Sequence, residues 1–164
     1  FFFLFQLCKE LGKLEEAVTS YRQAIKIKSD YTKAYFNLGN ILNDFGKFKE
    51  AISSLLVALK INPNYNEAHN CLAISYKKLS KYERAIIHYR KANTAESRAQ
   101  ILQCFYTLKK TNEYSKYLSK LCKDDPKNIK AASISTFVSN QLNLDNIYPF
   151  CKNPLKFIFF KNIK

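Results

Sequence analysis

The stretch NLGNILNDFGKFKEAISSLLVALKINPNY, residues 37 to 65, decides the fold of this chain. Its apolar residues recur at helical spacing in two blocks, one before the sequence FGKF and one after it. Gly46 lies between the blocks and predicts a turn there. Pro63 marks the end of the second helix, because proline is tolerated at a helix start and not inside. The stretch therefore predicts a helical hairpin.

Gly39 interrupts the first predicted helix, where a glycine costs about 1 kcal/mol relative to alanine. A phosphate-binding loop would need the arrangement G-x-x-x-x-G-K-[ST] or G-x-G-x-x-G, and neither Gly39 nor Gly46 lies in one. The equivalent residue in the next copy of the hairpin is Ala73, so the position requires a small residue. We interpret Gly39 as the site of a close helix–helix contact. We expect alanine to be tolerated there and a bulky residue to lower stability.

The hairpin recurs along the chain at a constant interval, which is the separation of Leu38 from Leu72. Internal periods of this length are typical of stacked helical repeats, in which neighbouring units bury a continuous core. The columns that coincide in three copies are Leu4, Leu38 and Leu72; Gly12, Gly46 and Ser80; Lys13, Lys47 and Lys81; Leu14, Phe48 and Tyr82; Ala17, Ala51 and Ala85; Val18, Ile52 and Ile86; Tyr21, Leu55 and Tyr89; and Ala24, Ala58 and Ala92.

These columns resemble the tetratricopeptide repeat (TPR) at the positions that define it. In the unit from 32 to 65 the matching residues are Tyr35, Leu38, Gly39, Leu42, Gly46, Phe48, Ala51, Leu55, Ala58 and Pro63. In the unit from 66 to 99 they are His69, Leu72, Ala73, Tyr76, Tyr82, Ala85, Tyr89 and Ala92, with departures at Ser80 and Ser97. The resemblance implies an all-α fold, a right-handed superhelix of stacked antiparallel helix pairs, with an irregular C-terminal tail.

We expect the TPR array to span residues 1–125. It comprises a truncated unit (1–31) with Gly12 in its turn, two full units (32–65 and 66–99) and a degenerate unit (100–125). The degenerate unit keeps the hairpin through Leu108, Asn112 and Tyr114, while Tyr117 replaces the alanine and Pro126 comes about three positions early. A capping helix is expected over 126–140, followed by the irregular tail, 141–164.

Three segments resemble the link region of some bacterial TPR proteins: RAQILQCFYTL at 98–108, VSNQL at 138–142 and YPFCKNPLKFI at 148–158. Those proteins continue into a 2-oxoglutarate- and Fe(II)-dependent oxygenase, whose iron is held by an H-x-D pair and a distal histidine. None of these ligands is present in this sequence. The lack of any methionine indicates a fragment of a longer protein. Two placements of the tail stay open, docking on the last helices or entry into a domain that this sequence lacks, and we expect the second.

The formal net charge is +14, but it is spread along the chain, and lysine outnumbers arginine by 23 to 4. A nucleic-acid-binding protein usually gathers its charge on one face, so we do not expect nucleic acid as a partner. An AT-rich genome would itself enrich Lys, Asn, Ile, Phe and Tyr codons. The 5 cysteines are widely spaced and odd in number, which favours reduced thiols and a cytoplasmic location. No apolar run approaches the roughly 20 residues that span a bilayer.

No catalytic constellation is apparent. The only histidines, His69 and His88, lack H-x-x-x-H, H-x-D or H-E-x-x-H spacing, and we expect both to be structural. No serine lies in a G-x-S-x-G elbow, and no cysteine has a local catalytic context. The sequence therefore predicts a chain without catalytic residues, cofactor or metal.

A concave surface remains as the candidate site. The TPR resemblance implies that unit positions 2, 5, 6, 9, 12 and 13 face a groove, and asparagine and aromatic side chains there suit an extended peptide. AT-rich composition is the alternative explanation of the asparagines. The implied lining is Phe2, Phe3, Gln6, Lys9 and Glu10; Lys33, Phe36, Asn37, Asn40, Asn43 and Asp44; and Glu67, Asn70, Cys71, Ile74, Lys77 and Lys78.

Two functions stay open. The first is a scaffold that binds a protein or an extended peptide without catalysis. The second is the substrate-recruiting part of a larger modifying enzyme, either the oxygenase above or a glycosyl- or sulfo-transferase. The fold cannot choose between them, because a repeat fixes a scaffold and leaves its surface free to vary.

Overall fold

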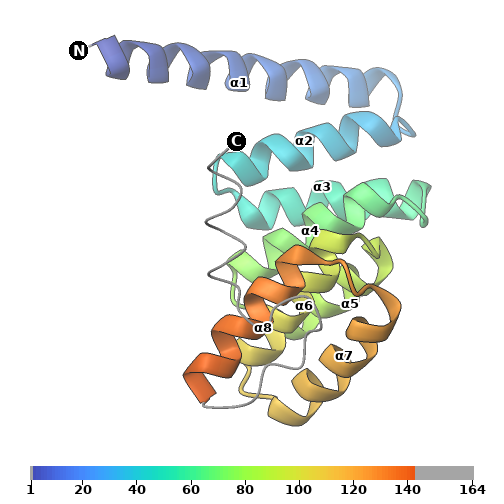
Figure 1. Ribbon diagram of the computed structural model, residues 1–164. Helices are drawn as coiled ribbons and strands as arrows, with labels where there is room; N and C mark the ends of the chain where they lie inside the picture. The colour runs from blue at the N-terminus through green and yellow to red at the C-terminus, as the bar shows by residue number, and fades with distance from the viewer. Residues whose placement is uncertain (1, 143–164) are drawn as a thin grey trace. The chain divides into compact units, whose positions relative to one another are not determined.

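The computed structural model describes the backbone of residues 2–142 and the side chains of residues 12–141. Every element of secondary structure in this described part is an α-helix, which confirms the all-α fold (Figure 1). The helices are α1 (Phe2–Ile27), α2 (Thr32–Asp44), α3 (Phe48–Ile61), α4 (Asn66–Lys78), α5 (Tyr82–Ala92), α6 (Ala95–Thr107), α7 (Thr111–Asp124) and α8 (Ile129–Leu142). Of the predicted tail, 141–164, the first two residues belong to α8, and the rest lies outside the described residues.

The chain divides into two compact blocks, block 1 up to Ala92 and block 2 from Asn93. In block 1, α2 pairs with α3 and α4 pairs with α5, while α1 packs on α2 and α4 packs on α3. In block 2, α6 packs against both α7 and α8. The described residues therefore form helix pairs stacked as in a TPR, as the sequence predicts for 32–65 and for the hairpin after it.

One residue with a positive φ lies between the two helices of each pair. These residues are Gly46 (φ 71°), Ser80 (φ 57°) and Lys109 (φ 56°). In the first pair the Gly46 amide donates to the Asn43 carbonyl over 2.9 Å, and the next amide donates to the Leu42 carbonyl over 2.8 Å. The amides of Ser80 and Lys109, and of the residue that follows each of them, make the same two bonds. This is the Schellman arrangement, which satisfies the last carbonyls of a helix and reverses the chain.

Small side chains let the paired helices of block 1 approach closely. Ala51, Ala58, Ala73 and Ala85 are all fully buried, at 0% exposure. The half-buried Val18, Tyr21 and Ile25 of α1 pack against a core cluster on α2 and α3. The members of that cluster are Leu38, Leu42 and Ala51. The predicted alanine positions are therefore confirmed as core.

Gly39 lies at the closest contact in this core, as predicted, but the expectation that alanine is tolerated there is wrong. A Cβ atom on Gly39 would lie 2.6 Å from Cγ and 2.9 Å from Cδ2 of Leu55. The backbone carbonyl of Ala51 would be 3.3 Å away. Leu55 is itself fully buried, so any shift of its side chain would disturb the surrounding core. Even one methyl group therefore overpacks this site.

Gly12 does not form the predicted turn. Helix α1 runs without a break from Phe2 to Ile27 and includes Gly12 in its interior. Among the described glycines only Gly46 has a positive φ. A glycine permits both conformations, and a helix tolerates it at a cost of about 1 kcal/mol, so the residue alone does not fix a turn. Residues 1–31 therefore contribute one long helix to block 1 instead of a truncated hairpin.

The fourth repeat unit is complete, but it begins earlier than predicted. The interval between the starts of α2 and α4 equals that between the starts of α6 and α8, whereas α6 follows α4 by a shorter interval. The predicted boundary between 99 and 100 falls inside α6. In the observed register Pro126 follows the turn residue Lys109 by the same interval as Pro63 follows Gly46. Pro126 is therefore in its regular place.

The shifted register changes which residue replaces the repeat's alanine. Ala51 and Ala85 each follow their turn residue by five positions, and the residue five positions after Lys109 is Tyr114, not Tyr117. The predicted capping helix is likewise α8, Ile129–Leu142, and it begins where the first helix of a next unit belongs. The predicted bounds 126–140 were set from Pro126 and start three positions too early.

The shift arises at the end of α5. This helix has 11 residues, compared with 14 in α3 and α7. It ends before Asn93, which has φ 48°, and Thr94 then caps α6. The Thr94 side chain accepts from the Ser97 amide over 3.0 Å, and the Ser97 hydroxyl accepts from the Thr94 amide over 2.7 Å. This reciprocal capping box sets the start of α6.

The contact between Gly39 and Leu55 can be tested by a double-mutant cycle. We expect Gly39→Ala to lower the free energy of unfolding by about 1–2 kcal/mol, because the overpacking outweighs the gain in helix propensity. In a Leu55→Ala background the same substitution should become neutral or stabilising, because the obstructing atoms are gone. Urea unfolding followed by circular dichroism measures both. Equal effects of Gly39→Ala in the two backgrounds would contradict the contact.

The left-handed turn at Ser80 predicts a stabilising substitution. Ser80→Gly should raise the free energy of unfolding by about 0.5–1 kcal/mol, because the left-handed conformation costs a residue with a Cβ about 1–2 kcal/mol and glycine loses part of this gain through its larger unfolded-state entropy. Ser53→Gly, at an exposed position within α3, is the matched control and should lower stability by about 1 kcal/mol. A decrease for Ser80→Gly in thermal denaturation would show that the turn is not strained.

Candidate functional site

The candidate site is the face of α2 and α4 that carries the predicted groove positions. Of its members, Lys33, Asn40, Asp44, Glu67 and Lys78 are exposed. The half-buried members are Phe36, Asn37, Asn43, Asn70, Cys71, Ile74 and Lys77. Since α2 and α4 also touch each other, these residues belong to one surface of block 1. The side chains of Phe2, Phe3, Gln6, Lys9 and Glu10 lie outside the described residues.

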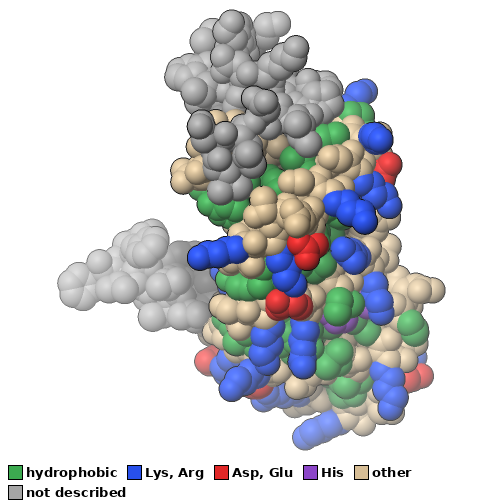
Figure 2. Space-filling view, turned by 90° about the horizontal axis from the view of Figure 1, so that it is seen from below, with side chains coloured by type: hydrophobic (Ala, Val, Ile, Leu, Met, Phe, Trp, Pro, Cys, Tyr) green, Lys and Arg blue, Asp and Glu red, His purple; other side chains and the backbone are tan. Residues whose placement is uncertain are grey.

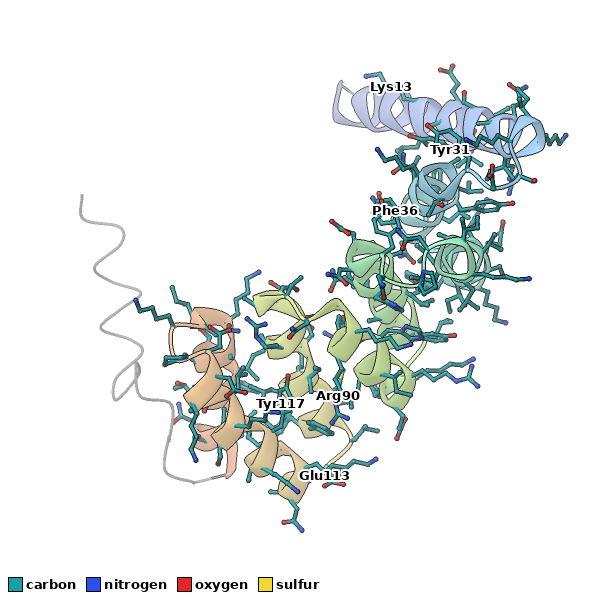
Figure 3. All side chains as sticks on the ribbon, turned by 90° about the vertical axis from the view of Figure 1, so that its right-hand side faces the viewer. Lys13, Tyr31, Phe36, Arg90, Glu113 and Tyr117 are labelled. Carbon is teal, nitrogen blue, oxygen red and sulfur yellow. The ribbon has the colours of Figure 1, made fainter. Side chains whose placement is uncertain are left out.

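An aromatic pair lies at the start of this surface. The rings of Phe36 on α2 (labelled in Figure 3) and of Tyr65, just before α4, have centroids 4.9 Å apart at an interplanar angle of 45°. Both side chains are half-buried, so the pair keeps part of its apolar area accessible. Burial, Glu67 and Cys71 together raise the pKa of the Tyr65 hydroxyl, which stays neutral. The pair offers an apolar anchor with a polar edge.

The asparagines of α2 tie neighbouring helices together. The Asn37 amide donates to the Tyr21 hydroxyl of α1 over 3.1 Å. The Asn40 carbonyl oxygen accepts from the Cys71 thiol over 3.5 Å. Both polar atoms of the Asn43 amide are engaged. Its Nδ2 donates to the Cys71 carbonyl over 3.3 Å, and its Oδ1 accepts from the Ser75 hydroxyl over 2.6 Å. Asn43 therefore holds α2 to α4 and has little capacity left for a ligand.

Asn40 differs from the other asparagines because its side chain is exposed and its contact with α4 engages only the oxygen. Its Nδ2 group points to no acceptor within the described residues and can still donate. Asn70 lies at the position of α4 equivalent to Phe36, and its Oδ1 atom is buried without a donor in the described part. A buried acceptor without a partner costs about 1–3 kcal/mol. Asn40 and Asn70 therefore have unused hydrogen-bonding capacity, and so does the Oδ1 atom of Asn37, whose bond to Tyr21 uses only Nδ2.

Charges alternate on this surface. Lys33 and Glu67 occupy equivalent positions at the starts of α2 and α4, while Asp44 and Lys78 occupy equivalent positions at their ends. On the face of the molecule seen in Figure 2, lysine and arginine side chains are separated by apolar, polar and acidic ones. At the starts and the ends of α2 and α4 the two signs are interleaved, so these positions do not present charge of a single sign.

Cys71 lies in the middle of the surface but is a poor nucleophile. Burial raises the pKa of its thiol to about 11, and the nearby carboxylates Asp44 and Glu67 act in the same direction. The thiolate is the reactive and metal-binding form, so a thiol of this pKa stays protonated near neutrality. Cys71 therefore contributes a weak hydrogen bond to Asn40 and packing.

The two histidines form a hydrogen-bonded pair that the sequence did not reveal. Nδ1 of His69 lies 3.0 Å from Nδ1 of His88, and Nε2 of His69 lies 3.0 Å from the Pro63 carbonyl oxygen. A carbonyl only accepts, so His69 carries its proton on Nε2, and its Nδ1 accepts from the Nδ1–H of His88. The His88 ring also stacks on Tyr76, with centroids 5.6 Å apart. The pair thus fixes the loop before α4 to both helices of the hairpin.

The bond between the two rings requires a neutral His69, whose Nδ1 accepts, and burial favours the neutral form of both rings. Burial lowers the pKa of His88 to about 4, with His69 and Lys91 as further causes. Burial and Lys91 also lower the pKa of His69, against the effect of its bond to Pro63. These contacts agree with the predicted structural role of both histidines. The ring nitrogens bond to each other and to the Pro63 carbonyl, and these bonds connect α4, α5 and the loop before α4.

The described residues contain no group of three or more His, Cys, Asp or Glu side chains that could hold a metal ion. Within the same part of the chain, no helix has both the length and the apolar character needed to cross a bilayer. Sequence reasoning missed the partners Tyr21, Tyr65 and His88. Their contacts join different helices, and only the relative placement of the helices brings them together.

The histidine pair predicts acid sensitivity. Because the folded pKa of His88 lies below its unfolded value near 6.5, its contribution is complete above pH 6.5 and is lost as the pH falls toward 4. We expect a loss of about 1 kcal/mol, reduced by the partial exposure of His88. The urea midpoint at pH 7, 5.5 and 4.5 measures it. In His88→Asn, whose amide can still donate to His69, the decline should be smaller; an unchanged decline would contradict the assignment.

The comparisons with known proteins concern the fold. Residues 6–44 and 39–80 match the family model described as TPR repeat. No curated protein matches the chain. A crystal structure of MamA superposes with a TM-score of 0.77 at 19% identity and covers 94% of both chains. A MamA chain from Desulfovibrio magneticus RS-1 has a TM-score of 0.61 at 18% identity, covering 70% of this chain and 68% of its own.

A third solved structure is YrrB, described as a TPR protein with an unusual peptide-binding site. It has a TM-score of 0.62 at 21% identity and covers 82% of this chain and 74% of its own. Identities this low show a shared fold. Together with the family match and the observed helix pairs, they show that this chain has a TPR-like fold, with the TPR repeat pattern matched over residues 6–80.

Proposed function

We propose that the surface of α2 and α4 binds an extended peptide or a protein segment and has no catalytic role. The single observation that carries this proposal is the half-buried ring pair of Phe36 and Tyr65, with the exposed Asn40 one helical turn beyond Phe36. An apolar anchor beside an amide with unused capacity is the combination that recognises a peptide side chain and its backbone. The peptide-binding site named for YrrB supports the same class of ligand.

The asparagines take separate roles in this proposal. Asn37 and Asn43 hold α2 to its neighbours, and Asn40 is the one offered to the ligand. The alternating charges of Lys33, Glu67 and Lys78 suit a peptide of mixed charge better than a polyanion. Lys77 and Ile74 extend the surface toward the end of α4.

The recruiting part of a modifying enzyme remains a prediction from the resemblance of 98–108, 138–142 and 148–158 to a link region. The last of these segments lies outside the described residues, so the geometry of the linkage carries no support here. Reading the gene beyond Lys164 tests it: an H-x-D pair followed by a distal histidine would support an oxygenase. A cytoplasmic location is likewise a prediction from the cysteine pattern.

The peptide-binding proposal can be tested by selection from a random peptide library displayed on phage, with the immobilised chain as bait. Isothermal titration calorimetry then compares one selected peptide across variants. We expect Phe36→Ala to weaken binding by about tenfold or more, since aromatic anchors dominate such interfaces. Asn40→Ala should weaken it by about three- to tenfold, since one hydrogen bond contributes about 0.5–1.5 kcal/mol.

Leu56→Ala is the matched control. Leu56 is 45% exposed on α3, away from the predicted groove positions, so its truncation removes apolar area without touching the proposed surface. Its affinity should equal that of the wild type, and circular dichroism should show that all three variants remain folded. A selection that yields no binder, or a Leu56→Ala variant weakened as much as Phe36→Ala, would refute the proposed surface.

A further inference from the structure

Block 2 contains a cavity that none of the repeat's familiar positions accounts for. It has a volume of about 520 Å³ and lies among α6, the turn after it, α7 and α8. This size falls within the range of about 300–1,000 Å³ typical of small-molecule sites. The residues that line it are Phe105, Tyr106, Thr107, Lys109, Lys110, Thr111, Tyr114 and Val138.

The cavity follows from two side-chain exchanges in the regular repeat. At the position of the fully buried Ala51 and Ala85, block 2 has Tyr114, whose ring acts as a wedge between the paired helices. Two positions after the turn, where block 1 has the aromatic residues Phe48 and Tyr82, block 2 has Thr111. A large residue has replaced a small one, and a small residue has replaced a large one. In keeping with these exchanges, α6 and α7 contact each other less extensively than the paired helices of block 1 do.

The position of α8 leaves this space accessible. In block 1, α4 packs on α3, whereas in block 2 the helix in the equivalent place, α8, packs mainly on α6. It contributes Val138 to the cavity wall. Thr107 and Lys109 are exposed and Tyr106 is half-buried, so the cavity opens to the surface at the turn between α6 and α7.

The lining has a definite chemical character. Phe105, Tyr114 and Val138 form an apolar interior and are each at most 6% exposed. The polar groups gather at the opening, where Lys109 and Lys110 supply positive charge and Thr107 and Thr111 supply hydroxyls. The described part of block 2, residues 93–142, has eight basic and four acidic side chains, which adds a general attraction for anions.

Because the cavity opens to the surface, water reaches its apolar walls. An apolar body that binds there removes this apolar surface from water, which is favourable. A charged group on the same ligand would lie at the opening, beside the ammonium group of Lys109, and would remain hydrated there. Such an arrangement does not require burial of a charge, which would be costly.

We propose that this cavity of block 2 is a binding site for a small amphiphilic anion, an aromatic or aliphatic body that carries one carboxylate or sulfonate group. The site is separate from the α2 and α4 surface and would operate whether or not that surface binds a peptide. Its specificity has two parts: Thr111 leaves room for the body, and Lys109 attracts the anionic group.

Two fluorescent probes separate these parts. Anilinonaphthalene sulfonate has an aromatic body with one sulfonate, and phenylnaphthylamine has the same body without the charge. We expect both to bind the full chain saturably at one site, the sulfonate more tightly. Thr111→Phe restores the ring of the regular repeat and should lower the affinity for both probes by about tenfold or more, because it occupies the space. Ser115→Phe, an exposed position on α7, is the matched control and should change neither.

Lys109→Gly tests the charge. It should lower the affinity for the sulfonate probe by about threefold and leave the neutral probe unchanged, as removal of one partly solvated charge predicts. Ser80→Gly makes the same backbone change in block 1 and should affect neither probe. Non-saturable binding, or unchanged affinities in Thr111→Phe, would overturn the site. Equal affinities of Lys109→Gly and the wild type for the sulfonate would overturn the assignment of an anion.

Discussion

The left-handed residue between the two helices of each pair is the constraint on which the rest of the structure depends. At Gly46, Ser80 and Lys109 the same two backbone bonds end one helix and turn the chain into the next. The first helix of every pair begins at the same distance in sequence before this residue, and the second helix begins two positions after it. Because the second helix starts at a fixed place relative to the turn, the position of the turn decides which side chains meet inside the pair. The register of the turn therefore determines the contents of the core.

The two blocks have the turn at the same place in the helix pair but differ in the packing between the paired helices. In block 1 the position five places after the turn is alanine, and the helices come so close that a methyl group on Gly39 would meet Leu55. In block 2 the same position is Tyr114, and a cavity opens beside it. In block 1 the proposed peptide surface, with Phe36, Tyr65 and Asn40, lies on the face of α2 and α4 and not between paired helices. The looser pair of block 2 places its candidate site between the helices.

The sequence was sufficient for the regular part of the fold because the signals there are local. Glycine at 46, alanine at 51 and proline at 63 each favour the conformation or packing that they adopt. It was insufficient at the fourth unit, because lysine at 109 does not signal a left-handed turn, and the helix start is set instead by the capping box of Thr94 and Ser97. The candidate surface was predicted as a face, but the roles of its asparagines depend on partners in other helices. The cavity could not be predicted, because it requires the corrected register.

The register of block 2 is thus the central claim, and nuclear magnetic resonance tests it directly. A residue with positive φ has its amide hydrogen unusually close to its own Hα, which gives a strong intraresidue nuclear Overhauser effect. We predict a strong effect at Lys109, matching that at Ser80, and the weak effect of a helical residue at Asn112, which lies in the first turn of α7. A weak effect at Lys109 together with a strong one at Asn112 would place the turn three positions later. That result would contradict the equivalence of Tyr114 with Ala51 and Ala85 and the origin of the cavity.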